Sequence, residues 1–316
     1  MSQNNPLVTV ITPTYNRADT YLAETIESVL AQDYPNFEYI VLDDGSQDDT
    51  VELLESYDDP RLQWSSHANM GESRTVNKGL EMAQGEFILI VNSDDPILPD
   101  LITKSVEFLQ ENPDVWATYP DWVMIDNASN IIEEITVLEY AYENMLRYHH
   151  CPLGPGAVFR RAVVDVGIRR EGKWRYVGDY EFWLKVGLRG KLKRLPQTLA
   201  SWRSHSEGAT IAYANPDMAQ EHVDVVKEYF QKPNLSITVQ KVKHEALCNA
   251  YYIAGTICLP KYYHTARVYF GRSILAMPFA PTRYPNFKRQ WRVILRTILF
   301  PKFAYTIVSK IKETMR

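Results

Sequence analysis

The chain has 316 residues, of which 45% are hydrophobic and 23% are charged, a balance typical of a globular protein with a large buried core. Its three cysteines have no paired spacing, which argues against a disulfide framework and favours a reducing compartment. The formal net charge is −5, but residues 281–316 carry nine Lys or Arg and one acidic residue, which leaves −13 for the rest. Because neither a signal peptide nor an apolar run long enough to cross a bilayer is visible, we expect a cytoplasmic protein.

The N-terminal third alternates predicted strands with predicted helices. β-branched or apolar runs predict strands at Leu7–Thr12, Glu38–Leu42, Arg61–Ser65 and Glu86–Val91. Helical periodicity falls between and after them, at Tyr21–Gln32, Val51–Tyr57, Ser73–Ala83 and Leu101–Gln110. This order predicts an α/β fold with a Rossmann-like, mostly parallel central sheet in a three-layer α/β/α sandwich. Ligands of such sheets bind at the carboxyl ends of the strands, so candidate site residues are sought there.

The C-terminal part is predicted to be helical. After short strands at Trp122–Ile125 and Ile131–Ile135, helical patterns cover Asp217–Phe230, Val242–Ile257, Tyr262–Met277 and Phe287–Ser309, with breaks at prolines. We therefore predict a catalytic domain over residues 1–215 and a helical C-terminal region over residues 216–316 that ends in a basic amphipathic tail.

Acidic residues follow three predicted elements at the expected edge of the sheet. Asp44 lies after the second strand, Asp94 and Asp95 lie after the strand Glu86–Val91, and Asp179 comes later in the chain. Each also has an ordinary explanation as a turn or helix-capping residue. Adjacent carboxylates need a counter-charge, however, and Mg²⁺ or Mn²⁺ bridging a diphosphate would supply it. A glycine-rich phosphate loop is missing after the first strand, which argues against P-loop NTPases and dinucleotide oxidoreductases.

Several motifs together resemble those of family 2 glycosyltransferases of the GT-A fold. They are Val8 to Arg17 (VTVITPTYNR), Val41 to Ser46 (VLDDGS), Asn69 to Gly71 with Arg74 and Asn77 to Leu80, and Ile90 to Asp95 (IVNSDD). Any one of them is weak, but their order and spacing are specific. The resemblance covers residues 7–99 well and extends weakly to Thr210. It implies inverting transfer of a sugar from a nucleotide-sugar, most plausibly a UDP-sugar.

The resemblance also implies a role for each matched residue. Nucleotide-binding positions are Thr12, Pro13, Thr14, Tyr15, Asp44, Arg74 and Asp94, and among them Asp44 would accept a hydrogen bond from the base. Asp95 would coordinate Mg²⁺ or Mn²⁺, with His205 as a further ligand. Asp179 would be the catalytic base that takes a proton from the acceptor hydroxyl. For Arg74 and His205 a surface or structural role is the alternative, and for Asp179 a helix cap.

Two positions depart from the family's pattern. Asn92 stands where many relatives have Asp, and an uncharged amide is a weaker metal ligand, so Asp95 is expected to hold the metal. Gly178 stands before the predicted base, where relatives often carry an acid. These departures keep a non-catalytic carbohydrate- or nucleotide-binding protein open as an alternative. A nucleotidyltransferase is a second alternative, although the glycine-rich basic loop it requires is missing.

The basic tail has its own expected partner. On a helix, Trp291, Leu295 and Ile298 share one face with cations around it, as in helices that lie on anionic membranes. We therefore predict peripheral attachment at the cytoplasmic membrane face through residues 287–316, with packing on the catalytic domain as the alternative. The other expected partners are a nucleotide-sugar donor and a saccharide or lipid-linked acceptor used in cell-surface polysaccharide or glycolipid synthesis. A nucleic-acid partner is not expected from the acidic net charge.

Overall fold

The computed structural model describes residues 5–205, 214–259, 261–278 and 287–299. The described residues fall into two compact units. One contains residues 5–142 and 151–205, and the other contains residues 143–150 and the described residues from 214 onward. The predicted division at residue 215 stays a proposal. Residues 143–150, which group with the C-terminal helices, were not expected there.

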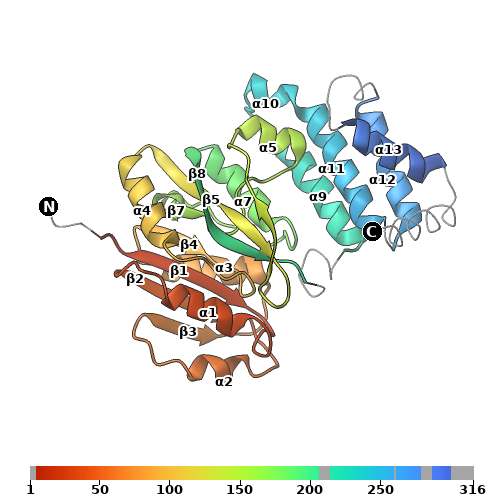
Figure 1. Cartoon of the computed structure of the whole chain (residues 1–316). Helices are drawn as coiled ribbons and strands as arrows, with labels where there is room; N and C mark the ends of the chain where they lie inside the picture. Colours follow the sequence, from red (N-terminus) through yellow and green to blue (C-terminus); the bar gives the residue numbers. More distant parts are fainter. Residues whose placement is uncertain (1–4, 206–213, 260, 279–286, 300–316) are drawn as a thin grey trace. The chain divides into compact units, whose positions relative to one another are not determined.

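A parallel sheet forms the N-terminal part of the first unit (Figure 1). Its strands are β1 (Val8–Thr14), β2 (Phe37–Asp43), β3 (Leu62–Ser66) and β4 (Phe87–Ile90), in the order β3-β2-β1-β4. All three neighbouring pairs are parallel, as the alternation of strands and helices predicts. The carboxyl ends of these strands therefore meet at one edge of the sheet.

Beyond β4 the sheet becomes mixed. The short β7 (Val158–Arg160) is antiparallel to β4 and to the long β5 (Val115–Ile125). Strand β6 (Ile131–Ile135) is antiparallel to β5, whereas β8 (Lys191–Arg203) runs parallel to β5. The fold class is confirmed, but β7, β8 and the first half of β5 are additions that the sequence pattern did not indicate.

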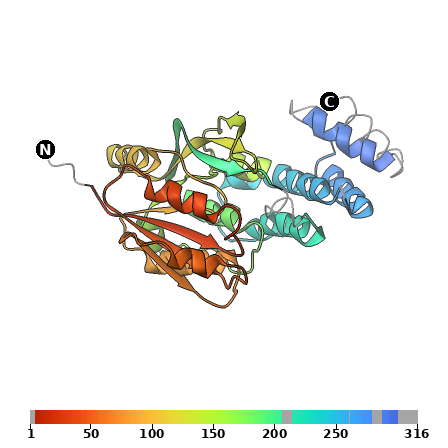
Figure 2. The same ribbon diagram turned by 60° about the horizontal axis from the view of Figure 1, so that its bottom comes forward.

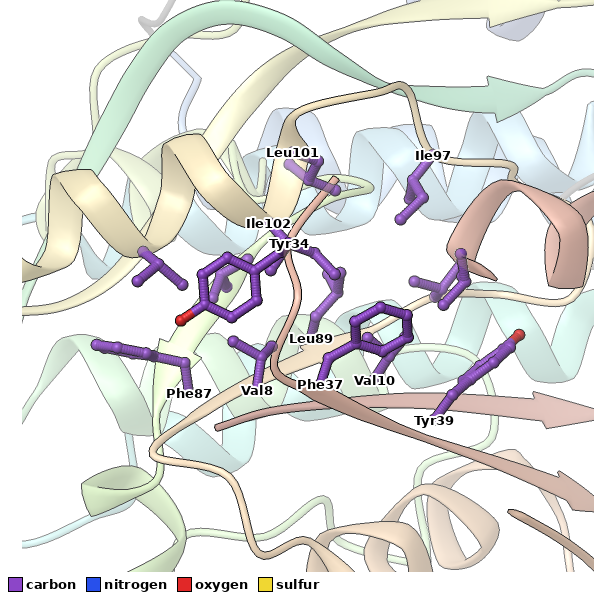
Figure 3. Packing of buried hydrophobic residues seen from close by; sticks show 14 of the residues in the cluster. Val8, Val10, Tyr34, Phe37, Tyr39, Phe87, Leu89, Ile97, Leu101 and Ile102 are labelled. Atoms are coloured by element: carbon purple, nitrogen blue, oxygen red, sulfur yellow. The ribbon is translucent and has the colours of Figure 1, made fainter. Parts of the chain in front are cut away.

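Helices cover both faces of this sheet and complete three layers (Figure 2). Helices α1 (Leu22–Leu30), α2 (Thr50–Glu55) and α4 (Leu101–Glu111) pack on one face of the sheet, the face that includes Val8, Val10 and Leu89. Figure 3 shows this packing around Val8, Val10, Phe37, Tyr39, Phe87, Leu89, Leu101 and Ile102. Such close packing of alternate apolar residues is the expected stabilisation of a sheet buried on both faces.

Helix α3 (Glu72–Met82) lies on the other face. A Cβ added to its Gly79 would stand 2.5 Å from Cγ2 of Ile11 on β1, so a glycine is what lets α3 approach the sheet. Helix α7 (Gly178–Gly187) packs aromatic side chains against Phe159 of β7, and the short α6 (Ala162–Asp165) follows β7.

The second unit is helical. It contains α5 (Tyr142–Tyr148) from its second residue, α9 (Pro216–Tyr229), α10 (Ile237–Lys241), α11 (Lys243–Cys258), α12 (Tyr263–Ala276) and α13 (Phe287–Leu299). Helix α9 begins as its sequence predicts. Asn215 Oδ1 accepts the Met218 N–H at 2.9 Å. Pro216 stands in the first turn, where its missing backbone N–H would have had no partner within the helix. The predicted helix Phe287–Ser309 is described only to Leu299, and residues 300–316 lie outside the described residues. Among the described helices none has the length and apolarity to cross a bilayer.

Candidate active site

The loops that follow β1 and β2 are tied to each other at the carboxyl edge of the sheet. The Asn16 backbone N–H donates to Ser46 Oγ at 2.8 Å, and Asn16 Oδ1 accepts the Gln47 N–H at 2.8 Å. The Asp44 N–H donates to the Thr14 carbonyl at 2.9 Å. Asn16 has φ of 52°, in the left-handed region that asparagine tolerates better than most residues. The sequence motifs of these two strands thus build one joint loop structure.

Asp44 is held firmly at the amino end of α3. Its Oδ1 accepts the Met70 N–H at 2.7 Å and its Oδ2 accepts the Gly71 N–H at 2.9 Å, and the residue is 5% exposed. Its neighbour Asp43 is fully buried and closes the turn by accepting the Ser46 N–H at 3.0 Å. Each Asp44 oxygen retains a second lone pair, so a donor on a nucleotide base remains a chemically suitable third partner.

The predicted nucleotide segment Thr12 to Tyr15 divides into inward and outward residues. Thr12 and Pro13 are buried, and Thr12 Oγ1 hydrogen bonds to the Tyr39 hydroxyl at 3.0 Å in the core. Thr14 is also buried, but its Oγ1 has no hydrogen-bond partner among the described residues. Tyr15 is 42% exposed. Of the four, only Thr14 and Tyr15 therefore have side-chain polar or aromatic groups left for a ligand.

Asp94 and His205 form a close pair after β4 and β8. Asp94 Oδ2 lies 3.0 Å from His205 Nε2 and 4.0 Å from an Arg17 guanidinium nitrogen. The Asp94 side chain is 20% exposed, whereas the His205 side chain is 1% exposed. The other ring nitrogen of His205, Nδ1, is buried and has no partner among the described residues. The structure therefore joins two residues that are more than a hundred positions apart and that the resemblance assigns to nucleotide and metal.

Asp95 occupies a different environment from Asp94. It is 3% exposed, its Oδ1 accepts the Arg203 backbone N–H at 2.8 Å, and its Oδ2 accepts Asn92 Nδ2 at 3.0 Å. Burial, with the neighbouring charge of Asp94, raises the pKa of Asp95 to about 7. Each oxygen already serves one protein donor, and the role of Asp95 as a metal ligand stays a prediction. The same distance of 3.0 Å gives a reason for Asn92, because an aspartate at position 92 would place a second negative carboxylate next to that of Asp95.

Arg203, at the end of β8, positions the loop that carries Asp94. Its guanidinium is fully buried and donates to the Asp94 carbonyl at 2.9 Å, to the Asp126 carbonyl at 2.9 Å and to Glu24 Oε2 at 2.5 Å. It also lies over the Tyr21 ring at 4.5 Å. This residue was not singled out from the sequence. The only available signal was its place two residues before His205 in a short polar segment.

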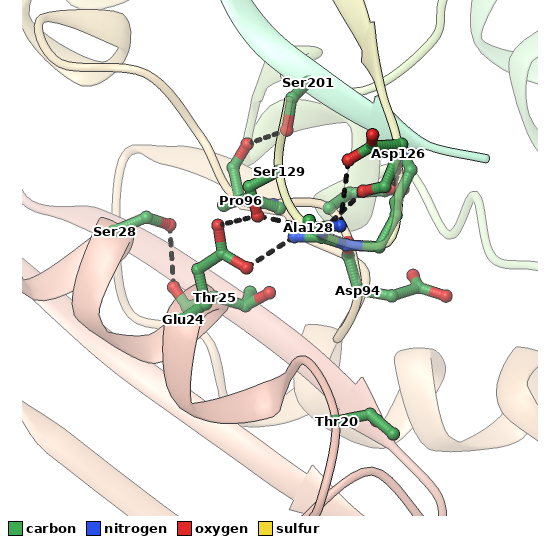
Figure 4. Close-up of polar contacts among 12 residues, drawn as sticks. Thr20, Glu24, Thr25, Ser28, Asp94, Pro96, Asp126, Ala128, Ser129 and Ser201 are labelled. Carbon is green, nitrogen blue, oxygen red and sulfur yellow. Dashed lines mark hydrogen bonds and ion pairs between the residues drawn. The ribbon is translucent and has the colours of Figure 1, made fainter. Parts of the chain in front are cut away.

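Further hydrogen bonds fasten the same loop to α1 and β8 (Figure 4). The Thr25 hydroxyl donates to the Ser93 carbonyl at 3.2 Å, and the Ser201 hydroxyl donates to the Pro96 carbonyl at 2.5 Å. Ser129, in the turn between β5 and β6, donates to Glu24 at 2.6 Å. The loop after β4 is therefore bonded to α1 and β8, and the β5–β6 turn is bonded to α1, before any ligand is considered.

Asp179 is placed by contacts between α3 and the segment before α7. Asn77 Nδ2 donates to the Arg170 carbonyl at 2.8 Å, and the Arg170 N–H donates to Asn77 Oδ1 at 3.0 Å. The Arg170 guanidinium donates to Glu72 at 2.6 Å. Asp179 itself lies in the first turn of α7 and is open to solvent. Protein atoms still surround it closely enough that desolvation raises the pKa of its carboxyl above the ordinary value, while Arg170 acts in the opposite direction. An accessible carboxyl with a raised pKa suits a general base.

Gly178 precedes Asp179, and Arg74 lies beside Gly172 of the preceding segment. A Cβ added to Gly178 would stand 2.5 Å from Ser73 Oγ, and that hydroxyl donates to the Trp174 carbonyl at 3.1 Å. There is thus no room for an acid at position 178 while Ser73 keeps this place. Arg74 is exposed, and its side chain packs along Gly172 without a hydrogen-bond or ion-pair partner among the described residues. Its predicted role beside the nucleotide stays a prediction.

The donor set fits a divalent cation that arrives with the substrate. No group of three or more His, Cys, Asp or Glu side chains suited to a metal occurs within the described ranges. Asp94 and His205 together offer one carboxylate and one imidazole, and the imidazole faces the carboxylate through Nε2. Mg²⁺ is commonly bound by one or two carboxylates plus substrate phosphates and water, and this pair matches that pattern. Asp94 and His205 would hold the ion, and the diphosphate of the substrate would complete its coordination.

Comparison with known proteins identifies related sequences. A family model described as Glycosyl transferase family 2 matches residues 9–166, which is half of the chain. The "Putative teichuronic acid biosynthesis glycosyltransferase TuaG" of Bacillus subtilis is 40% identical over 114 residues, covering 35% of this chain and 45% of that protein. The first curated relatives are matched over only 45% to 69% of their own length.

Solved structures share the fold. S. aureus TarS 1–349 in complex with UDP-GlcNAc superimposes with a TM-score of 0.67 at 21% identity, covering 92% of this chain and 89% of that chain. The mannosyltransferase PcManGT from Pyrobaculum calidifontis, in complex with GDP-Man and Mn²⁺, gives a TM-score of 0.61 at 19% identity, covering 94% and 86%. At these identities the likeness shows the fold alone, and it extends over the parallel and mixed parts of the sheet and the helices that follow.

Proposed function

Because the chain belongs to glycosyl transferase family 2, we propose that it moves a sugar from a UDP-sugar to an acceptor hydroxyl, with inversion and with help from Mn²⁺ or Mg²⁺. The observation that carries the proposal is the Asp94–His205 pair, 3.0 Å apart, at the sheet edge where the Asp44 loop also lies. Asp94 stays partly open to solvent beside the buried imidazole, so an ion that arrives with the substrate can reach the pair from the Asp94 side.

The metal ligands in this proposal are Asp94 and His205 rather than Asp95. Asp94 has one oxygen without a hydrogen bond among the described residues, whereas both Asp95 oxygens accept protein donors. A bound cation would offset the negative charge that develops on the departing nucleoside diphosphate. Arg17, 4.0 Å from Asp94, adds a positive charge on the same side. Asp95 then serves to hold Arg203 and Asn92, and through them the loop.

Asp179 acts as the base in this proposal. Its carboxylate takes the proton of the acceptor hydroxyl while that oxygen forms a bond to the anomeric carbon. The bond between this carbon and the diphosphate oxygen breaks on the opposite face, which inverts the anomeric centre. The raised pKa of Asp179 makes its carboxylate a better proton acceptor than an ordinary exposed one.

The choice of uridine and of the acceptor rests on Asp44 and on what the related proteins bind. Asp44 can accept from N3–H of uracil, and the TarS structure that matches this fold holds UDP-GlcNAc. The PcManGT structure holds GDP-Man, so guanine is the competing base. The TuaG relative carries a name from teichuronic acid biosynthesis, which supports a saccharide or lipid-linked acceptor in cell-surface polysaccharide synthesis.

The proposal is tested by measuring nucleotide diphosphate release from a panel of UDP- and GDP-sugars, with Mn²⁺, with Mg²⁺ and with excess chelator. We expect release from one UDP-sugar that requires the cation and falls by about 10²-fold or more in Asp94→Ala. Asp58→Ala, at an exposed aspartate between α2 and β3, is the matched control and should retain the rate. Full turnover in chelator, or an equal loss in both variants, would contradict the proposal.

A further inference from the structure

The outer surface of α12 and α13 carries only basic, neutral polar and apolar residues. Between Lys261 and Leu299 the sequence contains eight Lys or Arg residues and no Asp or Glu. Helix α9 of the same unit differs, because it carries Asp217, Glu221, Asp224 and Glu228. Acidic residues of this helical unit thus occur on α9 but not on α12 or α13, and α12 and α13 carry a net positive charge.

Each of the two helices has a buried stripe that packs inside the unit. On α12, Phe270 lies over Gly255 of α11, and Ser273 Oγ donates to the Cys248 carbonyl at 2.8 Å. On α13, Ile294 and Thr297 are buried. The Tyr263 hydroxyl of α12 donates to the Thr297 carbonyl at 2.9 Å, which joins the two helices. These contacts fix which residues of α12 and α13 are left facing outward.

The outward stripes combine exposed large apolar side chains with cations. On α12, Val268 is 54% and Leu275 is 81% exposed, and the exposed Arg272 lies between them at helical spacing. On α13, Leu295 is 42% and Leu299 is 71% exposed, one turn apart. The exposed Arg292 precedes them at the spacing that keeps all three on one face.

We propose that the exposed side chains of these two stripes, Val268, Arg272 and Leu275 on α12 and Arg292, Leu295 and Leu299 on α13, form one face that docks on an anionic lipid bilayer. Cations without neighbouring acids are complementary to anionic headgroups, and the exposed leucines can enter the boundary with the acyl chains. A soluble anionic polymer would be matched by the cations alone and would leave the leucines without a role. The face extends the basic amphipathic segment predicted from the sequence at 287–316 to α12, which that prediction did not include.

The proposal is tested by vesicle flotation with the full chain, using phosphatidylcholine alone and phosphatidylcholine mixed with phosphatidylglycerol. We expect binding to the mixed vesicles that weakens as salt increases, and little binding to the neutral ones. Each lost cation near an anionic surface weakens binding about fivefold, so Arg272→Gln with Arg292→Gln should weaken it about 25-fold. Leu275→Ser with Leu299→Ser should weaken it by about tenfold or more.

Matched controls lie in the first unit. Arg189 and Leu138 are exposed there, and Arg189→Gln and Leu138→Ser should leave vesicle binding unchanged. Absence of binding to mixed vesicles, salt-independent binding, or equal losses in control and test variants would overturn the proposal. So would a test variant that separates an oligomer in sedimentation without weakening vesicle binding, because the face would then be an interface between copies. The assay needs no nucleotide or sugar, so its outcome is independent of the proposed glycosyl transfer.

Discussion

Charged side chains are used in opposite ways by the loops around Asp94 and by the outer face of α12 and α13. In the loops, Arg203 and Asp95 are buried, and their charged groups hold other parts of the protein. On α12 and α13, Arg272 and Arg292 are exposed with no acid on either helix. The comparison shows that the charge of a sequence segment does not indicate whether its charged residues are structural or exposed. That depends on whether each charged side chain has a partner inside the protein, and the predictions below test this difference.

Removal of Arg203 should have the largest effect. In Arg203→Met the Asp94 and Asp126 carbonyls lose their donor, and each buried acceptor left without a partner costs about 1–3 kcal/mol, whereas the half-exposed Glu24 carboxylate returns to water. The free energy of unfolding from urea titrations should fall by that amount, and nucleotide release should fall with it. Unchanged stability would mean that this guanidinium does not fasten the loop.

Asp179→Asn should reduce kcat by about 10³-fold while leaving the fold intact, because a general base contributes about 10²–10⁴-fold. The wild-type rate should rise with pH through a pKa that lies above the ordinary carboxyl value, since the base must lose its proton to act. The variant should lack this rise. Desolvation by the surrounding protein disfavours the ionised form of Asp179, so at neutral pH the substitution should not lower the free energy of unfolding. A pH profile shared by both proteins would assign the titration to another group.

Asp95→Ala and Asp94→Ala should separate stability from activity. Asp95→Ala leaves the buried Arg203 N–H without its acceptor, at a cost of about 1–3 kcal/mol in the free energy of unfolding. Asp94→Ala removes a partly exposed side chain and should cost less than about 1 kcal/mol while abolishing the response of activity to Mn²⁺. Unfolding experiments measure the first quantity, and nucleotide release with and without Mn²⁺ measures the second. The opposite assignment, with stability lost in Asp94→Ala and metal response lost in Asp95→Ala, would restore Asp95 as the ligand.

Arg292→Gln should have the smallest effect on stability. Because the side chain is exposed on α13, the free energy of unfolding should change by no more than about 0.5 kcal/mol. It is the counterpart of Arg203→Met, with the same residue type in the opposite setting. A loss comparable to that of Arg203→Met would show that Arg292 has a structural partner and would remove the contrast between the two regions.

The fold was most predictable where local pattern and topology agree. Strands β1, β2 and β4 lie within two residues of their predicted bounds, because continuous apolar runs mark strands buried on both faces. Strand β8 escaped because Lys191, Lys193, Arg194 and Pro196 interrupt its apolar residues. Strand β7 has only three residues, too few to show a period. Pairing with β5 rather than its own composition makes β8 a strand.

The site was predictable as a set of positions but not as a set of contacts. Motifs at strand ends placed Asp44 and Asp94 in loops at the sheet edge, and Asp179 lies in the first turn of α7. They did not indicate which of Asp94 and Asp95 faces inward, because that depends on the Arg203 backbone N–H at 2.8 Å from Asp95, 108 positions away. Arg203 itself was missed for the same reason, since its partners come from three separate segments.

The 2.5 Å between Ser73 Oγ and the Cβ that Gly178 lacks also constrains the order in which this sequence can change. An acidic residue at 178 would meet the hydroxyl of Ser73, whereas Cβ of Ser73 stands at a tolerable 3.8 Å. A side chain at position 178 therefore requires the Ser73 hydroxyl to turn away or to be lost, and either change breaks its hydrogen bond to the Trp174 carbonyl. The pair is an instance of epistasis, because the residue at position 73 decides whether the position next to Asp179 is open to new side chains.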